Sequence, residues 1–179
     1  MSGTALSLLY GHRKSIDLDL FSNKKFSNEE VLKGLNKSFG KLLDIRSSKE
    51  AFWIFGFVDR VKVDLVKHPH PLIRPVQELD GIRMFSSEDI VAMKVQAVLQ
   101  RGRKKDFWDI AELLDHFSVD DFIRFHHEKY STQNLAITVP QAISYFADAE
   151  DDEDPVSLKK QTWKSVQQKI NDKVRSYLA

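Results

Sequence analysis

The first third of the chain places apolar residues at every second position, which is the period of a β-strand. This alternation predicts a strand at residues 15–22, where the apolar side chains share one face and Asp17 and Asp19 share the other. Residues 51–69 have the pattern of a β-hairpin, and its first arm is apolar on both faces, as expected of a covered, central strand. Asp64 lies in the second arm of the hairpin, on its more polar side.

Helical periodicity dominates the rest of the chain. A short helix is predicted at residues 4–10, with Ser2 or Thr4 as its cap and Gly11 at its end. One more short strand is expected at residues 81–85. Amphipathic helices are predicted at residues 27–39, capped by Ser27, and at 158–178, with an apolar stripe of Trp163, Val166, Ile170, Val174 and Leu178. Further helices are predicted at residues 86–101, capped by Ser86 and ended by Gly102, and at 104–117, 119–130 and 132–148, with an acidic linker at 148–155.

The composition is that of an ordinary globular protein of one domain, or of one domain with a helical extension. The 179 residues include 27 basic and 26 acidic side chains, so the bulk charge indicates neither a nucleic-acid coat nor a membrane surface. The order of the elements predicts an α+β fold. A small mixed β-sheet core with helices occupies residues 1–85, and a helical C-terminal bundle occupies residues 86–179.

The chain has no cysteine, which excludes disulfide bonds and thiolate chemistry and fits a reducing compartment. No apolar run approaches the roughly 20 residues that a membrane-spanning helix needs. The N-terminus lacks the basic and then apolar layout of a signal peptide. We therefore expect a cytoplasmic protein with no membrane partner.

Three carboxylates on neighbouring strands are the main candidates for chemistry. Aspartate is disfavoured in strands, so Asp17 and Asp19 on one strand face call for a functional reason. Asp64 on a second strand would complete a hard-oxygen site suited to Mg²⁺. Two such ions about 4 Å apart would clamp the attacking and leaving oxygens of a phosphoryl transfer.

The glycine turn near the N-terminus fits the same chemistry. Gly3 lets the backbone approach a phosphate closely, and the helix that follows offers unpaired N–H groups at its positive end. Lys94 and Arg101 are seven positions apart on one helix face, where either could neutralise phosphate charge. Asp106 and Asp109 share a face of the next predicted helix.

The segments SGTALSLLYGHRKSIDLDLFS (2–22) and KVQAVLQRGRKKDFWDIAEL (94–113) resemble the nucleotidyltransferase AbiEii/AbiGii toxin family, a branch of the polymerase-β-like nucleotidyltransferases. The family's first motif is a Gly-Gly or Gly-Ser turn, a helix and Asp-x-Asp. It is followed by a third carboxylate, a Lys/Arg helix and a closing Asp-x-x-Asp. The matching positions here are Ser2, Gly3, Thr4, Asp17, Asp19, Asp64, Lys94, Arg101, Asp106 and Asp109.

The resemblance implies a Mg²⁺-dependent nucleotidyltransferase that moves a nucleotide from a nucleoside triphosphate to an acceptor. In relatives the acceptor can be RNA, and the protein is the toxin of a toxin–antitoxin pair with a cognate antitoxin. Asp17, Asp19 and Asp64 would be the metal ligands and, with Lys94, the catalytic residues. The nucleotide-binding residues would be Ser2, Gly3, Thr4, Arg101, Asp106 and Asp109.

The chain departs from the family pattern at its start. Family members usually have a helix and a strand before the turn, and Ser2 replaces the first glycine here. A shortened N-terminal region predicts a frayed phosphate turn. An alternative function is therefore a binding module that keeps the nucleotidyltransferase shape without turnover. A further one is phosphoryl transfer to a protein or a small metabolite.

Several motifs have simpler interpretations. Asp17, Asp19 and Asp64 could be solvated or locally paired charges, and Lys94 with Arg101 could be ordinary helix-surface charge. The histidines at 68, 70, 126 and 127 lack the ligand spacing of a known zinc site. The aromatic residues at 52, 53, 55 and 57 are interpreted as core side chains rather than as base-stacking platforms.

Overall fold

The computed structural model describes residues 3–179, so Ser2, a predicted cap and nucleotide-binding residue, lies outside the described part. Within that part the contacts divide the chain into two compact units. Residues 15–71 form the sheet unit, and residues 3–14 and 72–179 form the helical unit. The predicted division at residue 85 follows the sequence motifs, whereas the contacts group residues 3–14 and 72–85 with the helices.

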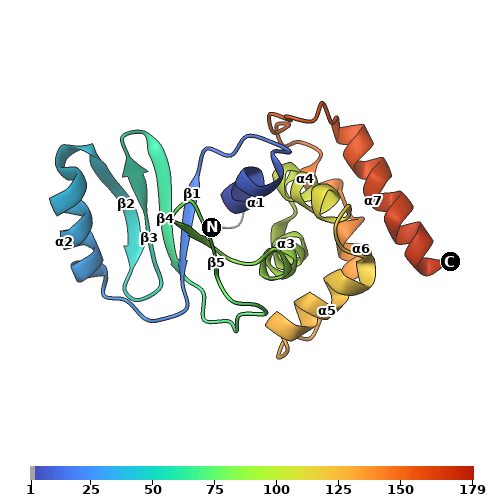
Figure 1. The fold of residues 1–179 in the computed structure, drawn as a ribbon, viewed down its shortest axis with the longest axis horizontal. Coiled ribbons are helices and arrows are strands. Elements are labelled where there is room, and N and C mark those ends of the chain that lie inside the picture. Colours follow the sequence, from blue (N-terminus) through green and yellow to red (C-terminus); the bar gives the residue numbers. More distant parts are fainter. Residues whose placement is uncertain (1–2) are drawn as a thin grey trace. The chain divides into compact units, whose positions relative to one another are not determined.

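The sheet unit contains a four-stranded sheet in the order β1-β4-β3-β2 (Figure 1). Its strands are β1 (Leu18–Ser22), β2 (Leu43–Lys49), β3 (Trp53–Val58) and β4 (Val61–Lys67). β1 runs parallel to β4, and the other two pairings are antiparallel. The hairpin and the internal position of β3 confirm the sequence prediction. Helix α2 (Asn28–Phe39) starts at the predicted cap Ser27, is followed by the 3-10 turn η1 (Gly40–Leu42), and packs against β2 and β3.

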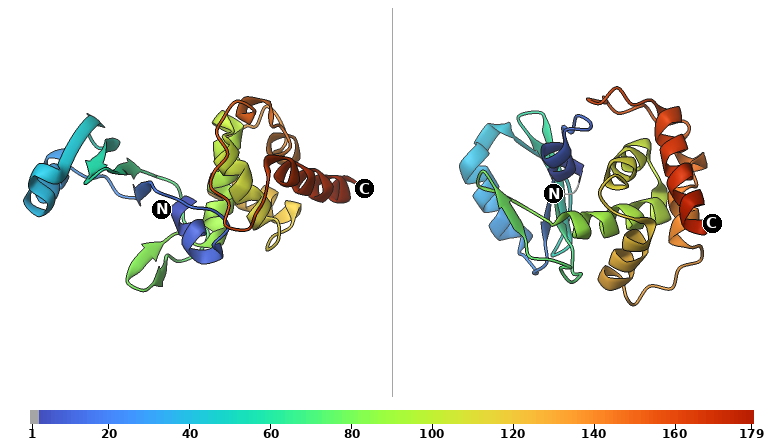
Figure 2. Two further views of the ribbon diagram at one scale, coloured as in Figure 1. Left: turned by 90° about the horizontal axis from the view of Figure 1, so that it is seen from above. Right: turned by 45° about the vertical axis from the view of Figure 1, so that its right-hand side comes forward.

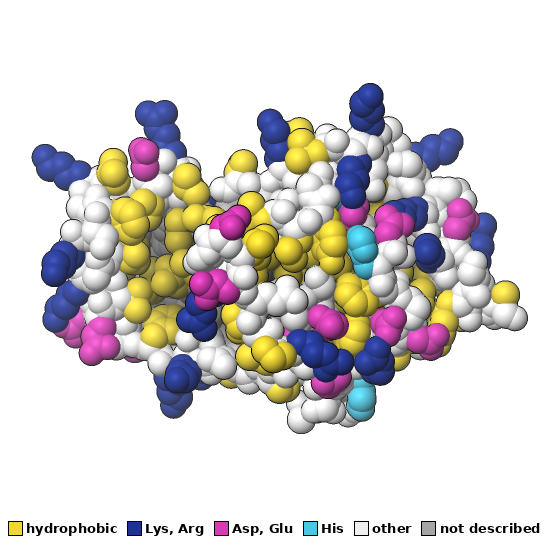
Figure 3. Space-filling model, viewed as in Figure 1, with side chains coloured by type: hydrophobic (Ala, Val, Ile, Leu, Met, Phe, Trp, Pro, Cys, Tyr) yellow, Lys and Arg dark blue, Asp and Glu magenta, His cyan; other side chains and the backbone are white. Residues whose placement is uncertain are grey.

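Two details of this sheet differ from the prediction. The first strand begins at Leu18 rather than at residue 15, so Asp17 precedes the strand, and Ile16 is 81% exposed. β2 was not predicted at all. Its alternation is interrupted by a bulge between Ile45 and Ser47, and most of its side chains are polar and exposed. On the face shown in Figure 3, hydrophobic side chains gather over the strands.

The helical unit combines one N-terminal helix with all the helices after residue 86. They are α1 (Gly3–Tyr10), α3 (Ser87–Arg101), α4 (Lys104–Leu113), α5 (Val119–Lys129), α6 (Val139–Ile143) and α7 (Trp163–Leu178), with a 3-10 turn η2 (Ala147–Ala149). A hairpin of β5 (Gln77–Leu79) and β6 (Ile82–Met84) precedes α3. α3 packs against α4, α5 and α6, while α7 packs against α4 and α5 (Figure 2).

Local signals account for most of these helix ends. Ser86 caps α3 by accepting a hydrogen bond from the Asp89 N–H, as predicted, and α3 ends at Arg101 before Gly102. Gly11 ends α1 in the left-handed region, at a φ of 58°, and its N–H donates to the Ser7 carbonyl. Thr4 lies inside α1, so the interpretation of Thr4 as a cap is wrong.

The long helix predicted at residues 132–148 is also wrong. Only the short α6 and η2 form there. Thr138 makes a capping box with Gln141, and Pro140 occupies the first turn, so the helix starts at Val139 and does not extend back to residue 132. The acidic linker contacts the helical unit, since Asp152 accepts the Lys104 N–H and Asp154 pairs with the Lys104 ammonium at 3.0 Å.

The core of the helical unit is aromatic and aliphatic. Trp108 and Phe107 of α4 are fully buried, and Trp163 of α7 stacks on Trp108 with centroids 5.7 Å apart. The predicted apolar stripe of the last helix is buried at Val166, Ile170 and Val174 but not at Leu178. No helix within residues 3–179 is long and apolar enough to cross a membrane.

Candidate functional site

Strands β1 and β4 bring two of the predicted carboxylates side by side. Asp19 and Asp64 are register partners in the parallel ladder. Because partners on neighbouring strands stand about 4.8 Å apart and point to the same face, their carboxylates project together. Asp17 lies one residue before β1, so the ladder does not fix where its carboxylate points.

The environment of Asp64 fits a cation ligand. One of its carboxylate oxygens pairs with the Lys62 ammonium, as the simpler interpretation expected. The other oxygen, Oδ1, is buried and has no hydrogen-bond partner in the described part of the chain. Buried polar atoms are nearly always satisfied, and an unpaired carboxylate oxygen beside a second carboxylate is a suitable donor for a hard cation.

This pair also weakens the sheet that carries it. Aspartate is unfavourable in strands, and like charges directly opposite each other destabilise a pairing. Across residues 3–179, no group of three or more histidine, cysteine, aspartate or glutamate side chains is arranged so that it could hold a metal ion. The site of three carboxylates therefore remains a prediction, with Asp19 and Asp64 as the two members that the strand register brings together.

A second cluster surrounds the start of α1 in the helical unit. A Cβ built on Gly3 would stand 2.7 Å from Nη2 of Arg13, 3.6 Å from Oδ2 of Asp109 and 3.8 Å from Nζ of Lys94. The first turn of α1 therefore packs directly against charged side chains from two other helices and from the segment after α1. Glycine fits here because a side chain could be accommodated only if the Arg13 guanidinium moved.

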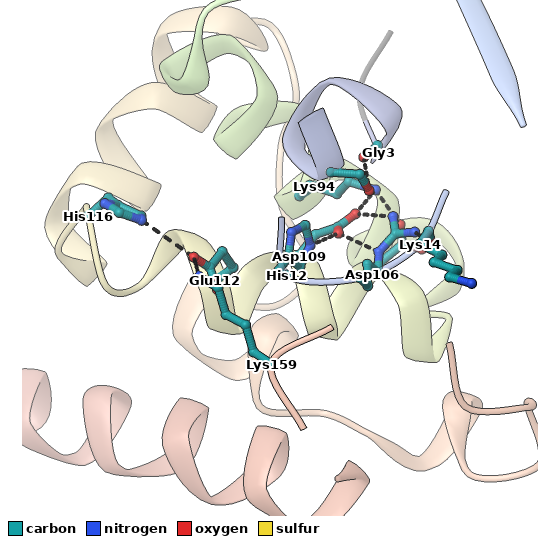
Figure 4. A network of polar contacts seen from close by, with 11 residues as sticks. Gly3, His12, Lys14, Lys94, Asp106, Asp109, Glu112, His116 and Lys159 are labelled. Atoms are coloured by element: carbon teal, nitrogen blue, oxygen red, sulfur yellow. Dashed lines mark hydrogen bonds and ion pairs between the residues drawn. The ribbon is translucent and has the colours of Figure 1, made fainter. Parts of the chain in front are cut away.

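Asp109 of α4 is the centre of this cluster (Figure 4). Arg13 binds it with two hydrogen bonds, from Nε to Oδ1 at 2.7 Å and from Nη2 to Oδ2 at 2.8 Å. His12 Nε2 lies 2.7 Å from Oδ1, and Lys94 of α3 pairs with Oδ2 at 2.7 Å. Lys94 also donates to Asp106 at 2.8 Å. The Asp109 cluster, as we call these five residues, is almost completely buried.

Burial and ion pairing shift the pKa values of Asp109 and Lys94 in opposite directions. Burial alone would raise the pKa of Asp109, but the charge of Lys94 and the hydrogen bonds from His12 and Arg13 hold that pKa well below its ordinary value. Burial alone would lower the pKa of Lys94, but Asp106 and Asp109 raise it above its ordinary value. The ion pair therefore stabilises the charged forms of both Lys94 and Asp109.

The cluster leaves a small number of donors for a ligand. An ammonium has three N–H groups, and Lys94 gives two of them to Asp106 and Asp109. The N-terminal end of α1 carries the positive partial charge of the helix dipole. The start of α1 beside Lys94 is therefore suited to a phosphate oxygen.

The structure brings together only some of the predicted nucleotide-binding residues. Gly3, Lys94, Asp106 and Asp109 meet in the helical unit. Arg101 is exposed at the last residue of α3 and makes no ion pair with a described residue, although it lies on the same helix face as Lys94. The Asp109 cluster also includes His12 and Arg13, which follow α1. They lie 97 and 96 residues from Asp109, and no local pattern could pair them with it.

Comparisons with known proteins agree with the family resemblance found in the sequence. The family model described as "Nucleotidyl transferase AbiEii toxin, Type IV TA system" matches residues 3–177. The chain is 32% identical over 182 residues to the uncharacterized protein aq_aa25 of Aquifex aeolicus (strain VF5), covering 98% of this chain and 85% of that protein.

Two solved structures from Helicobacter pylori share the fold. A candidate nucleotidyltransferase matches with a TM-score of 0.59 at 17% identity, covering 97% of this chain and 82% of that one. The protein JHP933 matches with a TM-score of 0.57 at 16% identity, covering 96% and 80%. The predicted α+β nucleotidyltransferase fold is thereby confirmed.

Proposed function

Because the chain belongs to the nucleotidyl transferase AbiEii toxin family of type IV toxin–antitoxin systems, we propose that it transfers a nucleoside monophosphate from a nucleoside triphosphate to an RNA acceptor. The family is one of nucleotidyltransferases, and it implies an antitoxin partner. The proposal adds the acceptor, the need for Mg²⁺ and action in the cytoplasm, where nucleoside triphosphates are available.

The observation that carries this proposal is the pairing of Asp19 with Asp64. Two carboxylates in register, one of which has a buried unpaired oxygen, form an oxygen donor set that Mg²⁺ favours. Asp17 would complete the set. A bound Mg²⁺ would supply charge neutralisation at the triphosphate.

The residues of the chain would then bind and orient the substrates. The N–H groups of the first turn of α1, with the third donor of Lys94, would hold phosphate oxygens of the triphosphate. Asp64 would accept the proton of the attacking acceptor hydroxyl as it forms a bond to the α-phosphorus and pyrophosphate leaves. Positioning and electrostatic stabilisation supply most of the catalysis in such transfers.

The direct test is transfer of label from an α-³²P-labelled nucleoside triphosphate to cellular RNA. Asp19→Asn and Asp64→Asn are expected to lower transfer at least a hundredfold, whereas Asp44→Asn should not change it. Asp44 is an apt control because it lies in the same sheet, on β2, and is paired with the Arg46 guanidinium at 2.6 Å. Transfer at the wild-type rate by the Asp19 and Asp64 variants would exclude this mechanism.

One observation favours the second candidate, a binding module without turnover. Lys94 is buried and already engaged by two carboxylates, as it would be in a purely structural role. Calorimetry with ATP and MgCl₂ separates the two candidates. A well-folded sample that binds no nucleoside triphosphate would support the binding module.

A further inference from the structure

Three aromatic side chains and two lysines cluster at one end of the sheet. Trp53 and Phe55 of β3 stack with centroids 5.7 Å apart and an interplanar angle of 13°. Phe52 meets Trp53 edge to face at 6.4 Å. The Lys49 ammonium lies 5.0 Å from the Phe52 centroid and 5.4 Å from that of Trp53, and Lys67 lies 5.6 Å from Phe52. We call Phe52, Trp53 and Phe55 the aromatic strip.

The aromatic strip is not the core of the sheet. Ile54, which lies between Trp53 and Phe55 in sequence and points to the opposite face, is fully buried. Trp53 and Phe55 are only partly buried, and Phe52 is 49% exposed. The interpretation of these residues as core side chains is therefore wrong for Phe52 and incomplete for the other two. Adjoining apolar side chains that remain accessible on a surface often mark an interaction site.

Trp53 and Phe55 of the aromatic strip share a sheet face with the paired carboxylates. Phe55 is the register partner of Asp64, which is in turn the partner of Asp19. Register partners point to the same face, so Phe55, Asp64 and Asp19 form one row across three strands. Trp53 lies two positions along β3, on the same face and stacked on Phe55.

Positive charge collects at the end of the sheet next to the strip. β1, β2 and β4 run in the same direction and end there, because β1 is parallel to β4 and both β2 and β4 are antiparallel to β3. Lys49 and Lys67 are the last residues of β2 and β4, and the exposed Lys24 and Lys25 follow β1 closely. Glu50, the acidic residue of the β2–β3 turn, is engaged because its carboxylate accepts the Asn28 N–H.

We propose that the aromatic strip and the lysines at this end of the sheet bind single-stranded RNA. Unpaired bases can stack on exposed aromatic rings, while an ammonium beside each ring remains within reach of the adjoining phosphate. A duplex hides its base faces and would not use the rings. This inference rests on the proposed function, since the RNA would be the acceptor whose hydroxyl meets the carboxylate row.

The test measures RNA binding without turnover. A 5′-fluorescein-labelled 12-nucleotide RNA of mixed sequence is titrated with the full chain in EDTA, without nucleoside triphosphate, and its fluorescence anisotropy is followed. Phe52→Ala is expected to raise the Kd about tenfold, which corresponds to the loss of one base stack. Phe39→Ala should leave the Kd unchanged. Phe39 is a matched control because it is an exposed phenylalanine, at 41%, on α2.

The lysines are tested through salt dependence. Each phosphate contact to a single strand contributes about 0.7 to the slope of log Kd against log salt concentration. The double variant Lys49→Gln/Lys67→Gln should therefore reduce that slope by about 1.4, measured from 50 to 200 mM NaCl. The paired change Lys33→Gln/Lys37→Gln on α2 removes the same charge elsewhere in the sheet unit and should reduce the slope by less than half as much.

Three outcomes would overturn the proposal. The first is a Kd of the Phe52→Ala variant within twofold of the wild-type Kd. The second is equal affinity of the wild-type chain for the single strand and for a duplex of the same sequence. The third is no binding of the RNA by the folded wild-type chain. Circular dichroism of each variant establishes that it is folded. Asp19→Asn should bind the RNA at least as tightly as the wild type while losing transfer, so failure of the binding surface and failure of the transfer mechanism are distinguishable.

Discussion

Nη2 of Arg13 lies 2.7 Å from the point where a Cβ on Gly3 would stand. This close approach joins the first turn of α1 to the Asp109 cluster, because the same guanidinium holds Asp109 with two hydrogen bonds. The position of the helix start is therefore set by a buried charged side chain ten residues later in the sequence. The predicted phosphate turn is thus anchored by α3 and α4, to which Lys94 and Asp109 belong.

Gly3→Ala tests this anchoring. Helix propensity alone predicts that alanine stabilises α1, by up to about 1 kcal/mol. The contact with Arg13 predicts the opposite, a loss of about 1–3 kcal/mol in the free energy of unfolding, because the methyl group must displace a buried guanidinium. Gly34→Ala is the control, since Gly34 lies inside α2 with nothing within 4 Å of its Cβ position and should show the stabilisation. Urea unfolding measures both, and a more stable Gly3→Ala would contradict the anchoring.

Asp109→Asn should be among the most destabilising polar substitutions in the chain. It leaves Lys94 and Arg13 buried without their shared carboxylate, and breaking a buried ion pair typically costs about 3–5 kcal/mol. Asp106→Asn should cost less, because Lys94 keeps Asp109 as a partner. The exposed pair Glu29–Lys33 supplies the control, and Glu29→Gln should change stability by about 0–1 kcal/mol. Equal losses for Asp109→Asn and Glu29→Gln in urea unfolding would show that the cluster is not structural.

Asp19→Asn should affect thermal stability in opposite directions with and without metal. In EDTA it removes the repulsion between Asp19 and Asp64 and should raise the Tm by about 1–3 °C. In 10 mM MgCl₂ the wild type should gain stability, because an ion that binds only the folded chain favours it, and the variant should gain little. Differential scanning fluorimetry measures both shifts, with Asp44→Asn as the control. A metal-induced rise that survives in the Asp19 variant would place the ion elsewhere.

His126 should make stability depend on pH. Burial, with the nearby His127 charge, lowers the pKa of His126 from 6.5 to about 4. Between these values the unfolded chain binds a proton that the folded chain does not, so the contribution of His126 to stability is lost as the pH falls from about 6.5 to 4. His126→Gln should reduce the slope of the free energy of unfolding against pH in that window. Urea unfolding at pH 7, 6 and 5 checks this, and parallel slopes for the two proteins would refute it.

Local sequence signals determine much of the fold. Ser27, Ser86 and Gly11 mark element ends because capping and left-handed turns depend on one or two neighbouring residues. The alternation of β2 is broken by its bulge, so the sequence pattern does not predict this strand. The helix expected at 132–148 does not form as one piece, because Pro140 is tolerated only in the first turn of a helix. Where capping residues, prolines or bulges contradict the apolar periodicity, these local features determine where the helix or strand forms.

The candidate site was predictable only in part, for a different reason. Asp19 and Asp64 could be expected to meet because alternation fixes the face on which each points, and one register was enough to pair them. The contact between Arg13 and Asp109 spans 96 residues and depends on how helices pack, which no motif encodes. The exposure of Phe52 likewise depends on what covers the end of a sheet rather than on its own neighbours in the sequence.

The sheet unit is inserted between two pieces of the helical unit, and this has a consequence for synthesis on the ribosome. Residues 15–71 are complete long before α4 emerges, so the sheet can form early, as domains generally do during translation. α1 is made first yet must wait for Asp109 about a hundred residues later. Until then Ala5 and Leu6, which are buried in the folded chain, lack the packing that α4 supplies, so α1 can complete its docking only after Asp109 has been synthesised.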